Sequence, residues 1–286
     1  MKFSVSSYSF SKYITDTKCD YFKICDLAKE MGFDAIEFTP LENESYGITT
    51  DPMKTAKELR EYCAKIGLDI SAYTVGADIR AEKEEAVKKV KAYIDVAEAL
   101  GAKVVRFDVC YGLPKDKHPY SYRDAIKEMV PYIRELADYG EAKGIRTCTE
   151  NHGYVFQSPE VVEELILAVD HKNYGWLCDV GNFLCTDADP ITAVAIALPY
   201  AFHIHFKDFL MKPGNQPCPK GFFTTRGGNH IRGTIIGHGV VPTTNCITMI
   251  KKSGYDGYVS VEFEGMERCL DAISAGLDFL KRGFAE

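Results

Sequence analysis

Four side chains that could bind a metal ion close four short apolar segments in the second half of the chain. The segments are 145–150, 174–179, 201–206 and 258–263, and they end at or beside Glu150, Asp179, His205 and Glu262. Three carboxylates and one imidazole suit a divalent cation of intermediate hardness, Mn²⁺ best, with Mg²⁺, Co²⁺, Zn²⁺ or Fe²⁺ as alternatives. Without a cation, three buried carboxylates would repel one another and some would have to be protonated. The plainer alternative is that each acid is a structural or surface group at the end of a strand.

The segments that carry these side chains belong to an alternation of strands and helices that runs through the chain. Amphipathic segments at 52–67 and 81–101 close on glycine, as helix C-termini prefer, and a third at 121–144 contains Pro131, which predicts a kink or a boundary. Eight strands are predicted, at 2–8, 34–38, 68–73, 102–108, 145–150, 174–179, 201–206 and 258–263. Strict alternation over 286 residues predicts an α/β protein with a closed (β/α)8 TIM barrel, forming a single domain over 1–286. A doubly wound open sheet is the alternative, but "SSYSFSKY" has no glycine-rich phosphate turn.

One connection is much longer than the others. Residues 209–240, after the seventh strand, are rich in Gly and Pro and contain no Asp or Glu. A loop of this length inside a compact domain is usually functional or disordered. Because it contains aromatic and β-branched residues ("GFFTT", "RGTII"), we expect an ordered lid over the strand ends that contributes Arg232 or His238 to the site.

Composition excludes several functional classes. The net charge of −7 argues against a nucleic-acid-binding protein, which usually has a basic face. There is no apolar run of about 18 residues for a membrane span, and "MKFSVSSYSF" lacks the apolar core of a signal peptide. The ten cysteines are scattered, with no CxxC pair. We therefore expect a cytoplasmic protein with reduced thiols that binds neither nucleic acid nor membrane.

The motifs on the later strands resemble a known family. "ENHG", "DVGN", "HIHFKD" and "VEFEG", together with "GFDAIEF" on the second strand, are similar to those of the xylose-isomerase-like TIM-barrel superfamily of sugar (phosphate) isomerases and epimerases. The resemblance covers essentially the whole chain. It implies that Glu150, Asp179, His205 and Glu262 are the metal ligands and that Glu150 and Glu262 also transfer protons.

The resemblance implies a metal-dependent isomerase or epimerase acting on a sugar or keto-sugar through a metal-stabilised enediolate. The alternative is a lyase on the same scaffold: a keto-polyol dehydratase, or the catalytic subunit of a C-glycoside deglycosidase acting on 3-oxo-glycosides. Such a subunit pairs with a second, β-rich subunit; a homo-oligomer is also possible. A DNA-repair enzyme like endonuclease IV and a non-catalytic sugar-binding protein are weaker alternatives.

Further candidate site residues follow from the motifs. His152 is a candidate general acid or base, or a loop histidine that donates to a backbone carbonyl. Asn182 stands where many epimerase relatives have a substrate-binding His, and His238 stands where relatives often have Glu. The remaining substrate-binding candidates are Arg106, Lys207 and Arg232.

Each of the remaining polar strand residues has a structural alternative. Lys207 and Asp208 are expected to orient a ligand or to form an ordinary ion pair. Arg106 and Glu37 contact substrate or make structural ion pairs. We expect His203 to face away from His205 and to serve in packing.

Overall fold

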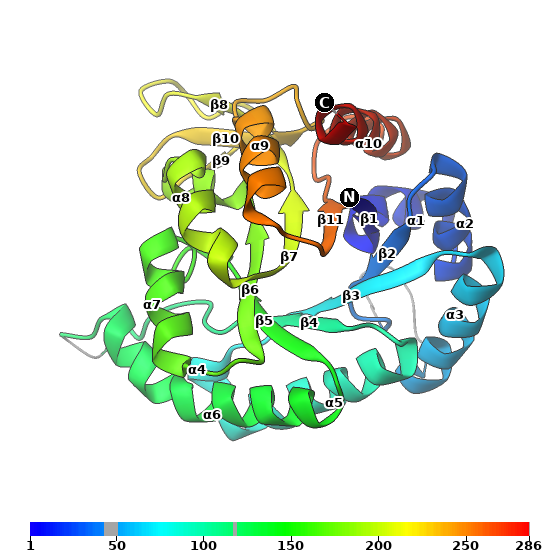
Figure 1. The fold of residues 1–286 in the computed structure, drawn as a ribbon. Helices are drawn as coiled ribbons and strands as arrows, with labels where there is room; N and C mark the ends of the chain where they lie inside the picture. The colour runs from blue at the N-terminus through cyan, green and yellow to red at the C-terminus, as the bar shows by residue number, and fades with distance from the viewer. Residues whose placement is uncertain (43–50, 117–118, 286) are drawn as a thin grey trace.

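The computed structural model describes residues 1–42, 51–116 and 119–285, and its centre is a closed barrel of eight parallel strands (Figure 1). Around the barrel the strands follow the order β1, β11, β7, β6, β5, β4, β3, β2. Their bounds are β1 Lys2–Ser6, β2 Ala35–Phe38, β3 Asp69–Val75, β4 Val104–Phe107, β5 Arg146–Glu150, β6 Tyr174–Asp179, β7 Ala201–Phe206 and β11 Tyr258–Val261. The predicted (β/α)8 barrel and all eight of its strands are confirmed.

Helices surround the barrel, as Figure 1 shows. They are α1 Ser11–Thr17, α2 Tyr21–Met31, α3 Pro52–Ile66, α4 Ile79–Glu82, α5 Glu84–Leu100, α6 Tyr122–Ala142, α7 Pro159–Val169, α8 Pro190–Ala197, α9 Thr243–Ser253 and α10 Cys269–Ala285, with 3₁₀ turns η1 Ser7–Phe10, η3 Asn182–Thr186 and η4 Leu198–Tyr200. The predicted helix 81–101 is broken at Lys83, whose φ of 50° is incompatible with a continuous α-helix. Pro131 does not end α6, because Met129 and Ile133 on either side are buried and tertiary packing holds the helix through the proline.

Inward-facing side chains alternate along the barrel strands and set the position of the site. Cys148 and Leu177 belong to a small buried apolar cluster with Ala72 and Val104. They lie two residues before Glu150 and Asp179, and residues two apart on a strand share a face. The polar strand ends therefore lie directly above an apolar layer that closes the barrel interior.

The long segment after β7 forms a second, antiparallel sheet. Its strands, β8 Asp208–Lys212, β9 Phe223–Thr224 and β10 His230–Thr234, lie in the order β8, β10, β9. Asp187, just after η3, fixes this sheet by accepting hydrogen bonds from Thr225 Oγ1 at 2.9 Å and Asn229 Nδ2 at 2.7 Å. The segment is thus an ordered structure, as expected.

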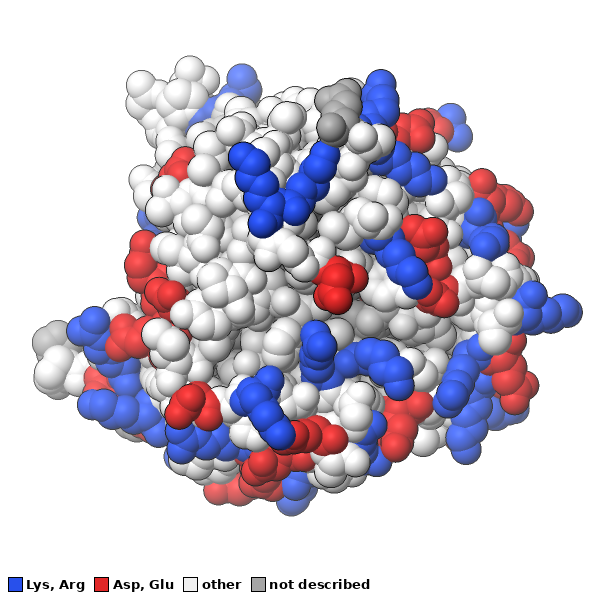
Figure 2. Space-filling view, viewed as in Figure 1, with Lys and Arg blue, Asp and Glu red and all other residues white. Residues whose placement is uncertain are grey.

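The surface and the helices give two further observations. Among the described residues, no helix is both long and apolar enough to cross a membrane. Basic and acidic side chains are interspersed over the face shown in Figure 2, and neither sign forms a broad area there. That face therefore lacks the basic surface typical of nucleic-acid-binding proteins.

Candidate metal and catalytic site

The four candidate ligands converge at the C-terminal end of the barrel. Glu150 and Asp179 are the last residues of β5 and β6, His205 is the penultimate residue of β7, and Glu262 follows β11 directly. One donor atom from each lies within 4.8 Å of the others. Barrel closure brings these ends together, so the convergence expected from the sequence is what the structure shows.

Two of the metal-binding atoms at this point have no hydrogen-bond partner among the described residues. Asp179 Oδ1 accepts backbone N–H groups from Gly181 at 2.8 Å and Asn182 at 3.0 Å, whereas its buried Oδ2 accepts none. His205 Nδ1 is likewise buried without a hydrogen bond. Buried polar atoms normally have partners, and a cation held between the carboxylates would supply one to both.

The pKa of Asp179 reflects its burial beside two other carboxylates. Burial raises the pKa of Asp179 to about 7; the charge of Lys207 opposes this shift, and the charges of Glu150 and Glu262 add to it. A divalent cation would reverse this balance and keep the carboxyl ionised. The donor set therefore fits a divalent metal ion.

A buried carboxylate on β2 orients the imidazole ligand. Glu37 Oε2 lies 2.9 Å from His205 Nε2 and 2.7 Å from His203 Nε2. Although burial opposes it, the two imidazoles hold the pKa of Glu37 well below its usual range. Engaging Nε2 leaves Nδ1 of His205 facing the other ligands, which is the usual way a carboxylate fixes a metal-binding histidine.

This contact corrects the expectation for His203 and decides between the two alternatives for Glu37. His203 does not face away from His205, because residues two apart on a strand point the same way. Glu37 is fully buried and pairs with the two histidines, which is the ion pair of the two alternatives.

Two buried cations neutralise the surrounding acids. Arg106 donates to Glu150 Oε2 through Nε at 2.7 Å and through Nη2, and its Nη1 reaches the Val75 carbonyl at 3.0 Å. Lys207 Nζ lies 2.8 Å from Glu262 Oε2 and 3.5 Å from Asp179 Oδ2. Both cations line the cavity, so each is positioned to touch a substrate as well as an acid.

Asn182 contacts the site residues directly. Its Nδ2 donates to Glu150 Oε1 at 2.8 Å, and its Oδ1 accepts from Lys207 Nζ at 3.3 Å. It positions these two side chains and does not line the cavity. In this structure the expected contact with a sugar hydroxyl is replaced by contacts within the protein.

His152 is paired with a carboxylate that the sequence analysis did not assign to the site. Its Nδ1 lies 3.0 Å from Asp108 Oδ1, and Tyr111 Oη donates to Asp108 Oδ2 at 3.3 Å. Burial lowers the pKa of His152, but the hydrogen bond and charge of Asp108 outweigh it and raise the pKa. The pairing leaves Nε2 as the ring nitrogen that can face a substrate, an arrangement suited to a general acid or base.

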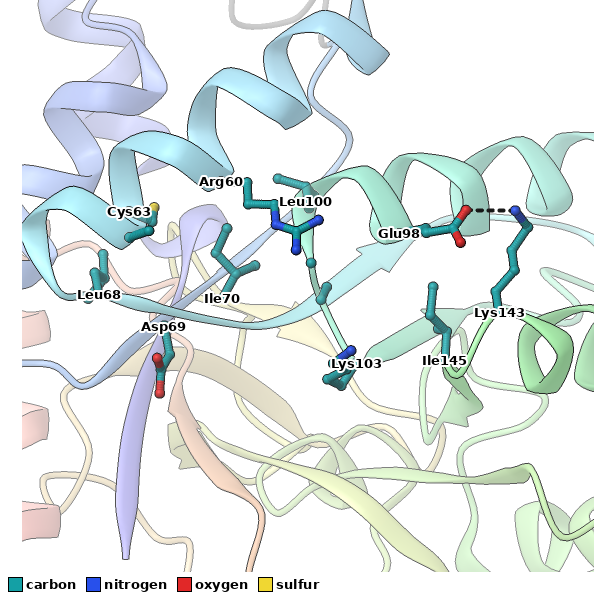
Figure 3. Close-up of a pocket in the computed structure, with 13 residues that line it drawn as sticks. Arg60, Cys63, Leu68, Asp69, Ile70, Glu98, Leu100, Lys103, Lys143 and Ile145 are labelled. Atoms are coloured by element: carbon teal, nitrogen blue, oxygen red, sulfur yellow. Dashed lines mark hydrogen bonds and ion pairs between the residues drawn. The ribbon is translucent and has the colours of Figure 1, made fainter.

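A cavity of about 240 Å³ joins these groups. It is lined by Tyr8, Thr39, Pro40, Thr74, Val75, Gly76, Arg106, Glu150, His152, His205, Lys207, Glu262 and Glu264. Asp108 and Glu264 were missed as site residues, although Asp108 closes the fourth predicted strand and Glu264 lies two residues after Glu262 on the same alternation. A larger cavity of about 440 Å³ lies at the opposite end of the barrel, beside the strand starts at Asp69, Lys103 and Ile145 (Figure 3), and contains none of these groups.

Neither candidate from the long segment lies at the cavity. His238 is exposed, and Arg232 forms an ion pair with Glu267 at 3.2 Å. The "GHG" turn instead surrounds Asp208, whose carboxylate accepts the backbone N–H groups of both Gly237 and Gly239 at 2.9 Å. The expectation of a lid that delivers Arg232 or His238 is therefore wrong.

Asp208 takes no part in an ion pair with Lys207, since neighbouring residues on a strand point to opposite faces. Besides the two turn glycines, its carboxylate accepts the N–H groups of Phe209 at 2.8 Å and Val241 at 3.1 Å. A side-chain carbon added at Gly239 would lie 2.2 Å from this carboxylate, so the turn requires glycine there. Asp208 thus anchors the end of the long segment.

A model of the xylose isomerase-like TIM barrel family matches residues 25–283. The chain belongs to this family. It is 24% identical over 150 residues to an inosose dehydratase of Lacticaseibacillus casei, a match that covers 52% of this chain and 50% of that protein. The match thus spans about half the length of that curated relative.

Solved structures share the fold over nearly the whole chain. A structure of the IOLI protein with a bound zinc atom superposes with a TM-score of 0.77 and 18% identity, covering 100% of this chain and 98% of that one. The 3-keto-D-glucoside 4-epimerase of E. coli gives a TM-score of 0.71 and 16% identity, with 99% of both chains covered. The similar proteins are therefore named both for elimination and for epimerisation.

Proposed function

We propose that this chain is a divalent-metal-dependent lyase that removes a β-substituent, water in the simplest case, from a keto-polyol or keto-sugar. The observation that carries the proposal is the presence, around one cavity, of four converging metal-binding groups and an imidazole held by a carboxylate. The inosose dehydratases among the similar proteins support elimination over isomerisation. The ion is a divalent cation, and Mn²⁺ suits a donor set of three carboxylates and one imidazole.

A bound divalent cation supplies Lewis-acid polarisation of a carbonyl, which acidifies the adjacent C–H bond. Among the described residues, both oxygens of Glu150 accept hydrogen bonds, whereas only Oε2 of Glu262 has a partner. Glu262 is thus the carboxylate better placed to take the proton from carbon.

The second half of an elimination needs an acid. As the C–H electron pair forms the new C=C bond, the bond to the β-oxygen breaks and that oxygen keeps its electron pair. His152 donates a proton from Nε2 to the departing oxygen while Asp108 stabilises the imidazolium. Lys207 also lines the cavity, and its positive charge stabilises the negative charge that develops on the departing oxygen.

Isomerase or epimerase chemistry is the second candidate. It is supported by the placement of Glu150 and Glu262 on separate strands of one cavity, since such chemistry removes a proton from carbon and returns one. The two reactions give different products: elimination releases water and leaves an unsaturated or diketo compound, whereas isomerisation leaves the mass unchanged.

The test is product analysis by mass spectrometry after incubating Mn²⁺-loaded protein with an inosose in deuterated water. We expect a product lighter by one water and a loss of rate of about 10²–10⁴-fold in His152→Asn. His171→Asn, a histidine outside the cavity, is the matched control and should retain the wild-type rate. An isomer that has lost no water and has gained one carbon-bound deuterium from solvent would overturn the lyase in favour of the second candidate.

A further inference from the structure

Two further cavities adjoin the catalytic cavity in succession. A second cavity of about 230 Å³ shares Tyr8 and Glu264 with the catalytic cavity. A third, of about 250 Å³, shares Lys12 and Cys269 with the second. Through these shared residues the three cavities follow one another from the catalytic cavity to the space between α1 and the start of α10, which lie side by side in Figure 1.

Elements from both ends of the chain line the second and third cavities, which together we call the outer groove. Its apolar members are Tyr8, Tyr13, Phe263, Met266 and Leu270. Tyr8 and Met266 are 38% and 49% exposed, so two large apolar side chains face solvent beside a polar catalytic site. An exposed apolar surface next to a site is typical of ligand contact.

The outer groove has no excess of positive charge. Its two cations, Lys12 and Arg268, are accompanied by three acids, Asp16, Glu264 and Glu267. An anionic group would gain little from such a lining, whereas an uncharged ring with one apolar face could lie on the aromatic side chains and direct hydroxyls to the rim.

The long segment after β7 supports the outer wall of this groove. Arg232 of β10 pairs with Glu267 at 3.2 Å, and Thr234 Oγ1 donates to the same carboxylate at 2.9 Å. Arg232 Nη1 also lies 3.7 Å from Met266 Sδ. The segment therefore holds Glu267 and Met266, two residues of the outer groove, in position.

We propose that the substrate is a two-ring compound: the reacting ring occupies the catalytic cavity, and an uncharged ring attached to it lies in the outer groove. This inference rests on the proposed function for the identity of the reacting ring. The attached ring is either an aryl group or a second sugar, since both present a flat apolar face.

Equilibrium binding tests the proposal without turnover. Phenyl β-D-glucopyranoside, cellobiose and methyl β-D-glucopyranoside are titrated separately into the protein by calorimetry. We expect the phenyl glucoside or cellobiose to bind at least tenfold more tightly than the methyl glucoside, and the tighter of the two identifies the attached ring. Equal affinities for all three, or no binding by any of them, would overturn the proposal.

Two variants test whether the second ring gains its affinity from the outer groove. Ser11→Trp fills the second cavity and should abolish the gain while leaving the Kd of the methyl glucoside within twofold. Because Ser11 begins α1 and its replacement could disturb the helix, Met266→Ala provides a milder change that should weaken the two-ring ligand three- to tenfold. Met53→Ala, an exposed methionine outside these cavities, is the matched control and should change nothing. A gain that persists in both groove variants would refute the placement.

The result is separable from the test of the lyase. Dehydration of an inosose with no binding gain from a second ring would remove the two-ring substrate and leave the lyase. A binding gain that disappears in Ser11→Trp, with no elimination on any keto compound, would remove the lyase and leave the outer groove as a binding site.

Discussion

Loss of the imidazole ligand should weaken metal binding and so reduce the stabilisation that a bound metal gives to the fold. His205 contributes one of four converging donors, and its Nδ1 is buried without a hydrogen bond. An ion that binds only the folded protein stabilises it by RT ln(1 + [L]/Kd), about 2.7 kcal/mol at a hundredfold excess over Kd. For a chain of 286 residues that corresponds to a rise in Tm of about 4–5 °C.

His205→Ala removes this donor and leaves three carboxylates. Even the partner of a metal-binding histidine is worth about 10–100-fold in metal affinity, so losing the histidine itself should weaken binding at least a hundredfold. At the same metal concentration the stabilisation then falls to RT ln 2, about 0.4 kcal/mol, and the rise in Tm to about 1 °C or less.

The assay is thermal denaturation of protein stripped with chelator, with and without added Mn²⁺, together with metal analysis of the purified protein. A second cluster with metal-binding groups, Asp138, Glu141 and His171, lies elsewhere on the chain. His171→Ala is therefore the control and should keep the full metal-induced shift. A wild-type shift and stoichiometry in His205→Ala, or their loss in His171→Ala, would refute the assignment of the site.

Three further changes test the surroundings of the site. Glu37→Gln should weaken metal binding about 10–100-fold, because the carboxylate orients His205; competition with a chelator measures this, and an unchanged Kd would contradict it. Lys207→Met should destabilise the metal-free protein by about 3–5 kcal/mol, since it leaves Glu262 without its buried cation, and by less with metal present. Urea denaturation measures the unfolding free energy of the metal-free and the metal-bound protein. An equal loss of unfolding free energy in the two would show that Lys207 and the metal do not neutralise the same acids. Asp208→Ala leaves four backbone N–H groups without their acceptor and should cost about 3 kcal/mol of unfolding free energy with metal affinity unchanged. A loss below about 1 kcal/mol would show that water replaces the carboxylate.

The sequence by itself determined the barrel and the four candidate ligands. Strict alternation of strands and helices implies parallel strands whose C-terminal ends share one face. Glu150, Asp179, His205 and Glu262 end strands in that alternation, so their convergence requires no knowledge of packing. Residues two apart on a strand share a face, so the sequence also places His203 on the side of His205 and Glu264 on the side of Glu262.

Other contacts depended on the arrangement of the strands in the folded barrel. Glu37 meets His205 across 168 positions of the chain, and Arg106 meets Glu150 across 44. No local sequence pattern identifies such partners, because a buried acid can pair with any buried cation or imidazole that lies close to it in the fold. Only the position of each strand around the barrel decides which of them meet.

The position of the long segment was decided by tertiary structure alone. Its length and composition predicted order correctly but placed Arg232 and His238 at the catalytic cavity. The Asp208 carboxylate draws the 237–239 turn onto itself through backbone N–H groups, and Asp187 holds the other end of the sheet. Backbone hydrogen bonds to a buried acid carry no side-chain signature, so the sequence shows that such a segment exists but not which surface it covers.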